Sequence, residues 1–402
     1  MVQEPVGLVL SGGGARGAYE AGVVAGITEI LGGGRPSPFN VFSGTSVGAI
    51  NAGWLAAHAD RGDMGIDELV KQWCGLNLDA HLNLDPLGML GLQSGPFRKR
   101  ERGSHYGRSL LNPEVLERLV FSAVDWERLH RNVDSGKVQA LLVAALHIAT
   151  GQTTIFAELT KGMQFRGSSD PRRRSRCELI RAEHVLASAA LPLLFPSRRI
   201  GPHYYCDGGL RFNTPISPAL RCGAEKLVVI TLQHQDDRGG GARLNSERLA
   251  QYPSPLFLLG KVLNALMLDQ VSYDLQVLDR LNKLISVLEA ELEPQELAKV
   301  EQVLCETRGL PYRRIRTLVF EPSESIANIA SRFAERIRVR GLSTLLVRQF
   351  AKYEDALESD VLSYLLFDGT FAEQLISLGK RDVWNRRDEV YSFFDSSKTV
   401  NK

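Results

Sequence analysis

A serine held between two glycines is the feature of this sequence with the clearest chemical meaning. Gly44-Thr45-Ser46-Val47-Gly48 is a Gly-x-Ser-x-Gly pentapeptide. In this pattern the serine occupies a sharp strand-to-helix turn, and Gly44 and Gly48 let the two elements approach without a Cβ clash. A helix starting at Ser46 also directs N–H groups and its positive dipole end toward a developing anion. Ser46 is therefore a candidate nucleophile; the alternative is a glycine-rich connection in which it only caps the helix.

A serine nucleophile needs a base, and the sequence offers a carboxylate more readily than a histidine. Asp207 follows the aromatic run Tyr204-Tyr205-Cys206 and precedes Gly208 and Gly209. A carboxylate within roughly 2.6–3.2 Å of a serine hydroxyl can take its proton directly. In α/β-hydrolases the histidine follows the acid, and of eight histidines only His234 lies after Asp207. A Ser-His-Asp triad stays open as an alternative, and Asp-Gly-Gly could also be a hairpin turn.

A second glycine run, Gly12-Gly13-Gly14-Ala15-Arg16-Gly17, lies between a predicted strand and a predicted helix. It matches the Gly-x-Gly-x-x-Gly dinucleotide fingerprint, which also requires an acidic residue near the end of the second strand. That strand ends in Phe42-Ser43-Gly44-Thr45-Ser46, without a carboxylate, and no Gly-Lys-Ser/Thr completes a P-loop. Bare N–H groups at a helix start still form an anion cradle. Beside a nucleophilic serine, such a cradle is an oxyanion hole.

The elements that must position these residues alternate between strand and helix. Short apolar runs predict strands at 6–10, 39–43, 138–146, 227–232 and 318–320, and 153–156 is expected to pair with the third of these as a hairpin. Small-residue and apolar spacing predicts helices at 18–31 and 49–59. Two strand–helix units in succession predict a parallel sheet covered on both faces.

The second half of the chain is expected to be mostly helical. A glycine-rich linker at 236–241 precedes a long stripe with apolar residues at steps of three and four, from Val271 to Leu292. We favour a core face or a helix hairpin over a membrane or dimer face for this stripe. We predict a catalytic domain at 1–235, a helical insertion at 242–310, and a mostly helical C-terminal part at 311–402 packed on the catalytic domain.

Bulk composition narrows the class of protein. The 402 residues are 44% hydrophobic and 23% charged, as in a soluble globular protein. Lys and Arg number 48 against 46 Asp and Glu, a net charge of +2, which argues against a nucleic-acid partner. Five scattered cysteines without a Cys-x-x-Cys pair argue for reduced thiols and against a zinc site. No signal peptide and no bilayer-spanning stretch is evident, so we expect a cytoplasmic protein that would have to reach any membrane from water.

Taken together, four blocks resemble the patatin-like phospholipase family. In family order they are an oxyanion loop (Gly12, Gly13, Gly14 and Arg16), a nucleophile elbow (44–48), an Ala-Ser-x-x-x-Pro block (187–192), and Asp207-Gly208-Gly209 followed by Asn213-Thr214-Pro215. The resemblance covers about residues 6–232. It implies an α/β fold, a three-layer α/β/α sheet with a helical insertion and a helical C-terminal part. It also implies a Ser-Asp dyad without histidine, no metal or cofactor, and hydrolysis of phospholipids or related acyl lipids.

The resemblance also implies roles for these residues. Ser46 would attack the acyl carbonyl, Asp207 would accept its proton, and N–H groups around Gly13 and Gly14 would hold the oxyanion. Arg16 would brace that loop or meet the lipid phosphate. Two alternatives stay open: an acyltransferase with the same dyad, and a non-catalytic lipid-binding scaffold. A dinucleotide-binding protein is a third alternative.

Three further segments bear on lipid binding. Arg98-Lys99-Arg100 with Arg102, and Arg172-Arg173-Arg174 with Arg176, are basic runs in predicted loops that could contact anionic headgroups. Solvated charged loops are the alternative. The segment 84–92 is either a hydrophobic lid or part of the core. We expect a lipid substrate and transient peripheral membrane contact, and the sequence leaves the oligomeric state open.

Overall fold

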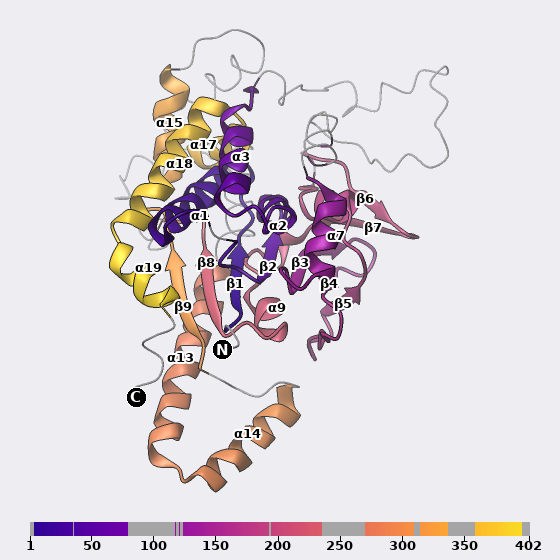
Figure 1. Cartoon of the computed structure of the whole chain (residues 1–402). Helices are drawn as coiled ribbons and strands as arrows, with labels where there is room; N and C mark the ends of the chain where they lie inside the picture. The colour runs from indigo at the N-terminus through magenta and orange to yellow at the C-terminus, as the bar shows by residue number, and fades with distance from the viewer. Residues whose placement is uncertain are drawn as a thin grey trace, which may run out of the picture.

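Nine strands in the described part of the chain form one mixed sheet (Figure 1). The computed structural model describes residues 4–34, 36–78, 117, 120, 124–192, 194–234, 270–308, 314–336 and 358–395. The strands are β1 (Val6–Leu10), β2 (Val41–Thr45), β3 (Ala140–His147), β4 (Thr153–Leu159), β5 (Arg173–Cys177), β6 (Arg198–Ile200), β7 (His203–Asp207), β8 (Lys226–Ile230) and β9 (Arg316–Phe320). Their order is β5-β4-β3-β2-β1-β8-β9, with β7 paired to both β3 and β6.

Helices surround this sheet. In the first half they are the short η1 (Gly14–Gly17), α1 (Ala18–Leu31), α2 (Val47–Ala57), α3 (Asp63–Cys74), α7 (Trp126–Asp134), α8 (Ala182–Ser188), the short η2 (Gly208–Leu210) and α9 (Ile216–Arg221). In the second half they are α13 (Gln270–Glu291), α14 (Pro294–Arg308), α15 (Ile326–Arg336), α17 (Glu358–Leu365), α18 (Gly369–Trp384) and α19 (Arg387–Phe394).

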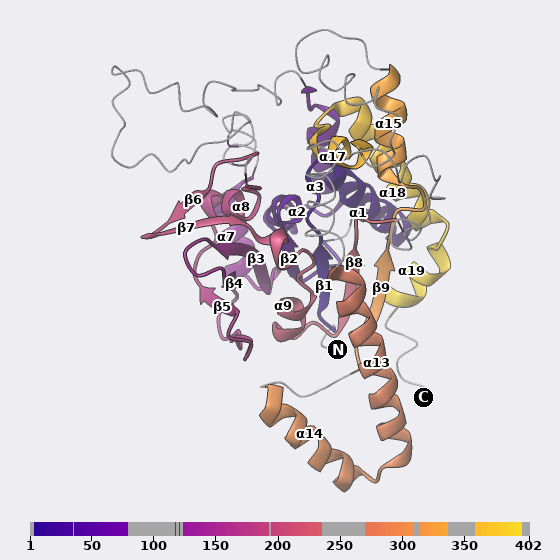
Figure 2. The ribbon, with the colours of Figure 1, turned by 180° about the vertical axis from the view of Figure 1, so that it is seen from behind.

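Alternation along the strands builds a core on each face of the sheet. Leu8 and Leu10 of β1 point into a large core shared with α1, α2 and α18, whereas Val9 points into a second core with α9 and α13. The helices of the second core face the viewer in Figure 2. Because both faces are covered, the central strands are buried throughout. This arrangement confirms the predicted three-layer α/β/α fold.

The register of β3 brings two strand ends together. β2 pairs with β3 in parallel as far as Thr45 opposite Ala144. β7 runs antiparallel to β3 and places Asp207 opposite Ala145, the next residue along. The residue that follows β2 and the last residue of β7 therefore meet at the same point on β3.

Most predicted elements form within two residues of their expected ends. The strand expected at 39–43 is β2 at Val41–Thr45, and the helix expected at 49–59 is α2 at Val47–Ala57. The β3–β4 hairpin is confirmed as an antiparallel pair, and β9 joins the sheet parallel to β8. The division into parts at 1–235, 242–310 and 311–402 stays a prediction.

The basic run at 172–176, predicted to lie in a loop, lies mostly in a strand. Arg173, Arg174 and Arg176 belong to β5, which pairs in parallel with β4 at the edge of the sheet. The guanidinium carbon of Arg173 lies over the ring of Phe212, 4.1 Å from the ring centroid. Charged side chains on an edge strand discourage pairing with another chain, which accounts for this composition. The other basic run, 98–102, and the segment 84–92 lie outside the described residues.

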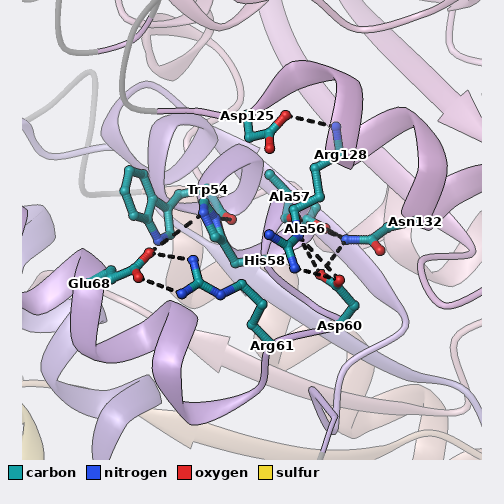
Figure 3. A network of polar contacts seen from close by, with 10 residues as sticks. All are labelled: Trp54, Ala56, Ala57, His58, Asp60, Arg61, Glu68, Asp125, Arg128 and Asn132. Atoms are coloured by element: carbon teal, nitrogen blue, oxygen red, sulfur yellow. Dashed lines mark hydrogen bonds and ion pairs between the residues drawn. The ribbon is translucent and has the colours of Figure 1, made fainter.

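Helix α2, which begins beside Ser46, is held at its far end by a polar network (Figure 3). The amide of Asn132 on α7 donates to the carbonyls of Ala56 and Ala57, at 3.0 and 2.9 Å. Arg128 donates to the Asp60 carboxylate at 2.7 Å, and this bond lowers the pKa of Asp60 to about 2. The network satisfies C-terminal carbonyls that a helix leaves unpaired.

The helices of the second half differ in how closely they pack against the rest of the described structure. α18 lies along α1, where Tyr19 donates to Asp382 at 3.0 Å and Lys380 meets Glu29 at 2.6 Å. On α13, Leu278 and Ile285 of the predicted apolar stripe are buried, whereas Leu284, which does not belong to the stripe, is 54% exposed. Both views show α14 away from the sheet (Figures 1 and 2). No helix in the described ranges is both long and apolar enough to cross a membrane.

Candidate active site

The turn at Ser46 has the backbone that a nucleophile elbow requires. Ser46 has φ 55° and ψ −126°, and it is the one non-glycine residue with positive φ in the described part of the chain. A Cβ on Gly44 would lie 2.3 Å from the carbonyl oxygen of Gly48, and a Cβ on Gly48 would lie 2.4 Å from that of Leu10. The glycines therefore permit close strand–helix packing around a residue whose conformation costs about 1–3 kcal/mol.

The Ser46 side chain faces a carboxylate. Its Oγ donates to Oδ2 of Asp207 at 2.7 Å, and it makes no capping hydrogen bond to α2. The other carboxylate oxygen, Oδ1, accepts the N–H of Gly209 at 2.7 Å. Asp207 ends β7 and is followed by η2 rather than by a hairpin turn. Gly208 fits against β3, since a Cβ there would lie 2.3 Å from the oxygen of Ala144.

Burial tunes the carboxylate toward a base that works near neutral pH. Asp207 is fully buried, and this desolvation raises its pKa to about 7, although the hydrogen bonds from Ser46 and Gly209 act in the opposite direction. A general base is most effective when its pKa lies close to the working pH. The geometry and the pKa together suit direct proton transfer from Ser46 to Asp207.

Ser188, a fully buried residue of the Ala-Ser-x-x-x-Pro block, contacts the backbone of the nucleophile. Its Oγ accepts the backbone N–H of Ser46 at 2.8 Å and donates to the carbonyl of Ala144 at 2.6 Å. Ser188 therefore ties the strained turn of the nucleophile to β3. The Ala-Ser-x-x-x-Pro block marks Ser188 in the sequence, but that motif does not predict its hydrogen bond with Ser46.

The glycine loop lies beside the nucleophile. The N–H of Gly12 donates to the carbonyl of Asn213 at 3.2 Å, and the Asn213 amide donates back to the oxygen of Gly12 at 3.2 Å. A Cβ on Gly12 would lie 3.0 Å from the Cβ of Ser46. Among the described residues, the N–H groups of Gly13 and Gly14 meet no acceptor. These two groups are therefore available to an anion.

Arg16 is buried beneath this loop rather than displayed on it. Its Nε donates to Oγ of Ser363 at 2.7 Å, and its guanidinium carbon lies 4.2 Å from the ring centroid of Tyr364. A longer bond of 3.4 Å reaches the carbonyl of Leu232. With 2% of its surface exposed, Arg16 supports the loop, which favours the bracing role over contact with a lipid phosphate. The sequence does not predict that Ser363 or Tyr364 contacts this loop, because α17 lies more than 300 residues away from Arg16.

The histidine alternative finds no support at this site. Nδ1 of His234 lies 2.7 Å from the carbonyl oxygen of Pro322, whereas the hydroxyl of Ser46 is bonded to Asp207.

One of the comparisons with known proteins identifies the family of the chain. No curated protein sequence matches the chain. Among solved structures, VipD from Legionella pneumophila is similar, with 13% identity and a TM-score of 0.31 over 93% of this chain and 67% of that chain. A sequence model described as patatin-like phospholipase matches residues 8–220, more than half of the chain, and this range contains both Ser46 and Asp207. The chain belongs to the patatin-like phospholipase family.

Proposed function

We propose that this protein is a serine lipid acyl hydrolase of the phospholipase A or lysophospholipase type, working through a Ser46–Asp207 dyad and an acyl-enzyme. Its family consists of hydrolases that act on lipid esters. The observation that carries the proposal is the 2.7 Å hydrogen bond from Ser46 Oγ to Asp207 Oδ2 at a strained strand-to-helix turn. An apolar cavity beside Ser46 supports an acyl chain as the group that is bound there.

In the first half-reaction, the proton of Ser46 passes to Oδ2 of Asp207 while Oγ attacks the acyl carbonyl carbon. The carbonyl oxygen becomes an oxyanion, which the N–H groups of Gly13 and Gly14 stabilise. When the intermediate collapses, the ester C–O bond breaks and the leaving alcohol takes the proton from Asp207. The acyl group is then covalently attached to Ser46.

In the second half-reaction, water gives a proton to Asp207 and attacks the acyl carbonyl. Collapse of this intermediate breaks the bond to Oγ, which recovers the proton from Asp207, and the fatty acid leaves. Asp207 is held for both steps, since its Oδ1 stays bonded to Gly209 while Oδ2 exchanges the proton. Transient contact with a lipid surface is part of the same proposal, because the substrate resides there.

The test compares wild type, Ser46→Ala, Asp207→Asn and Asp382→Asn on a fluorogenic acyl ester and on mixed phospholipid vesicles. Asp382 is a matched control, since it is also a buried carboxylate that accepts a hydroxyl hydrogen bond, here from Tyr19. We expect both dyad variants to lose roughly 10⁴-fold or more in kcat, and Asp382→Asn to keep wild-type kcat. Turnover by a folded Ser46→Ala protein would refute the assignment of the nucleophile.

A further inference from the structure

The nucleophile lies against a small apolar cavity with walls from two distant parts of the chain. The cavity has a volume of about 30 Å³, which is about two to three times the minimum that a single water molecule requires. One wall follows α8 and the other ends α17 and leads into α18. The principal wall residues are Leu191, Leu194, Phe195, Tyr364, Leu365 and Phe367.

These walls form a hydrophobic cluster of their own. Leu191, Leu194 and Tyr364 are buried against one another, with Phe195 and Leu365 packed beside them. The cluster is separate from the two cores on the faces of the sheet. It sits over the nucleophile, where an apolar substituent of a substrate would meet it.

The C-terminal wall is attached to the oxyanion loop. Arg16 donates to Ser363 and its guanidinium stacks over the ring of Tyr364. Gly14 lies so close to the backbone of Tyr364 that a Cβ on Gly14 would be 2.3 Å from the Tyr364 oxygen. The position of this wall relative to the reacting atoms is therefore set by buried contacts, so that its side chains can define the size of the cavity.

We infer that Leu365, together with Leu194 on the opposite wall, limits the length of the acyl chain that reaches Ser46. The inference rests on the proposed function, and it assigns acyl-chain selectivity partly to a segment outside the region 8–220 that the family model matches. A cavity of about 30 Å³ has room for only the first carbons of an acyl chain, so the later carbons of a longer chain press against these walls. In an apolar pocket each added or missing methylene changes selectivity by about 10–200-fold.

The experiment measures kcat/KM for monomeric 4-methylumbelliferyl butanoate and dodecanoate with wild type, Leu365→Ala and Leu194→Ala. Leu31→Ala is the matched control, because Leu31, like Leu365, is a partly buried leucine, and it lies at the C-terminal end of α1, whereas the oxyanion loop precedes the N-terminal end. Thermal unfolding and titration with a serine-reactive phosphonate give the folded, active fraction of each protein. Because Leu365 and Leu194 lie on different walls of the cavity, the test can be completed with one variant if the other does not fold.

We expect the dodecanoate-to-butanoate ratio to rise at least about tenfold in the cavity variants and to stay at the wild-type value in Leu31→Ala. The same ratio in all four proteins, with both esters cleaved, would overturn the inference and leave the hydrolase proposal intact. A rise of equal size in Leu31→Ala would also overturn it, since the effect would then not belong to the cavity. Failure of wild type to cleave either ester would overturn the hydrolase proposal and the inference with it.

Discussion

Lowering the pH below about 7 should suppress the attack by Ser46, because Asp207 must be ionised to accept the proton. Burial raises the pKa of this carboxyl from 3.8 to about 7. The ionised fraction, and with it kcat/KM, should therefore fall about tenfold for each pH unit below 7. We expect about one-tenth of the plateau rate at pH 6 and about one-hundredth at pH 5.

The assay is initial-rate hydrolysis of an uncharged fluorogenic ester between pH 5 and 9, since kcat/KM reports the pKa of the free enzyme. Glu20→Gln is the control. Glu20 is a second buried carboxyl whose pKa is raised by desolvation, but it bonds to Asn51 and to the Ser11 amide instead of to the nucleophile. The midpoint of the profile should be the same in wild type and in Glu20→Gln.

Two results would refute this reasoning. A profile that is flat from pH 5 to pH 8 would mean that Asp207 ionises like an exposed carboxylate or does not act as the base. A midpoint that moves with Glu20→Gln would assign the titration to Glu20.

Three further predictions concern single residues. Asp207→Asn should raise the free energy of unfolding at pH 8 by up to about 4 kcal/mol, at 1.36 kcal/mol per pKa unit between 3.8 and about 7. A raised pKa makes the wild-type fold lose stability as the pH rises from 3.8 to about 7. Urea denaturation at pH 4 should therefore show almost no gain in the free energy of unfolding of Asp207→Asn over wild type. An equal gain at pH 4 and pH 8 would contradict the burial argument. Ser188→Ala should lose about 1–3 kcal/mol of stability by leaving a buried N–H unpaired and lower kcat at least tenfold, whereas Ser43→Ala, which loses only a 2.8 Å bond to a carbonyl, should keep kcat. Gly14→Ala should lower kcat, because its Cβ would lie 2.3 Å from a backbone oxygen of α17. Gly32→Ala is the control, since Gly32 also has a positive φ, 83°, but its Cβ would meet no atom within 4 Å. This control should lose only about 1–2 kcal/mol of stability and keep the wild-type kcat.

The parts of this fold that the sequence predicts best are those that local chemistry specifies. The turn at Ser46 needs glycines on both sides, and the pentapeptide shows them directly. The apolar runs that became β1, β3 and β8 are short and bounded by turn residues, which marks buried strands. Asp207 could be placed at a strand end because an aromatic run precedes it and glycines follow it.

The parts that the sequence does not predict depend on pairing between distant segments. β5 is an edge strand whose arginines resemble those of a solvated loop until its pairing with β4 is known. Ser188 contacts the nucleophile only because the register of β3 places Ala144 beside them both. The hydrogen bond from Arg16 to Ser363 joins residues that are 347 positions apart in the sequence. No periodicity or motif predicts a contact at that sequence separation.

The most direct test of the account is to identify the residue that becomes covalently modified. Wild type would be treated with a fluorogenic acyl ester under acid-quench conditions, and in parallel with an alkyl fluorophosphonate, and the peptides would be analysed by mass spectrometry. We expect one adduct, on Ser46, that is absent from Ser46→Ala and strongly reduced in Asp207→Asn at the same pH. An adduct on another residue, or an equal yield of adduct in Ser46→Ala, would contradict the assignment of Ser46 as the nucleophile.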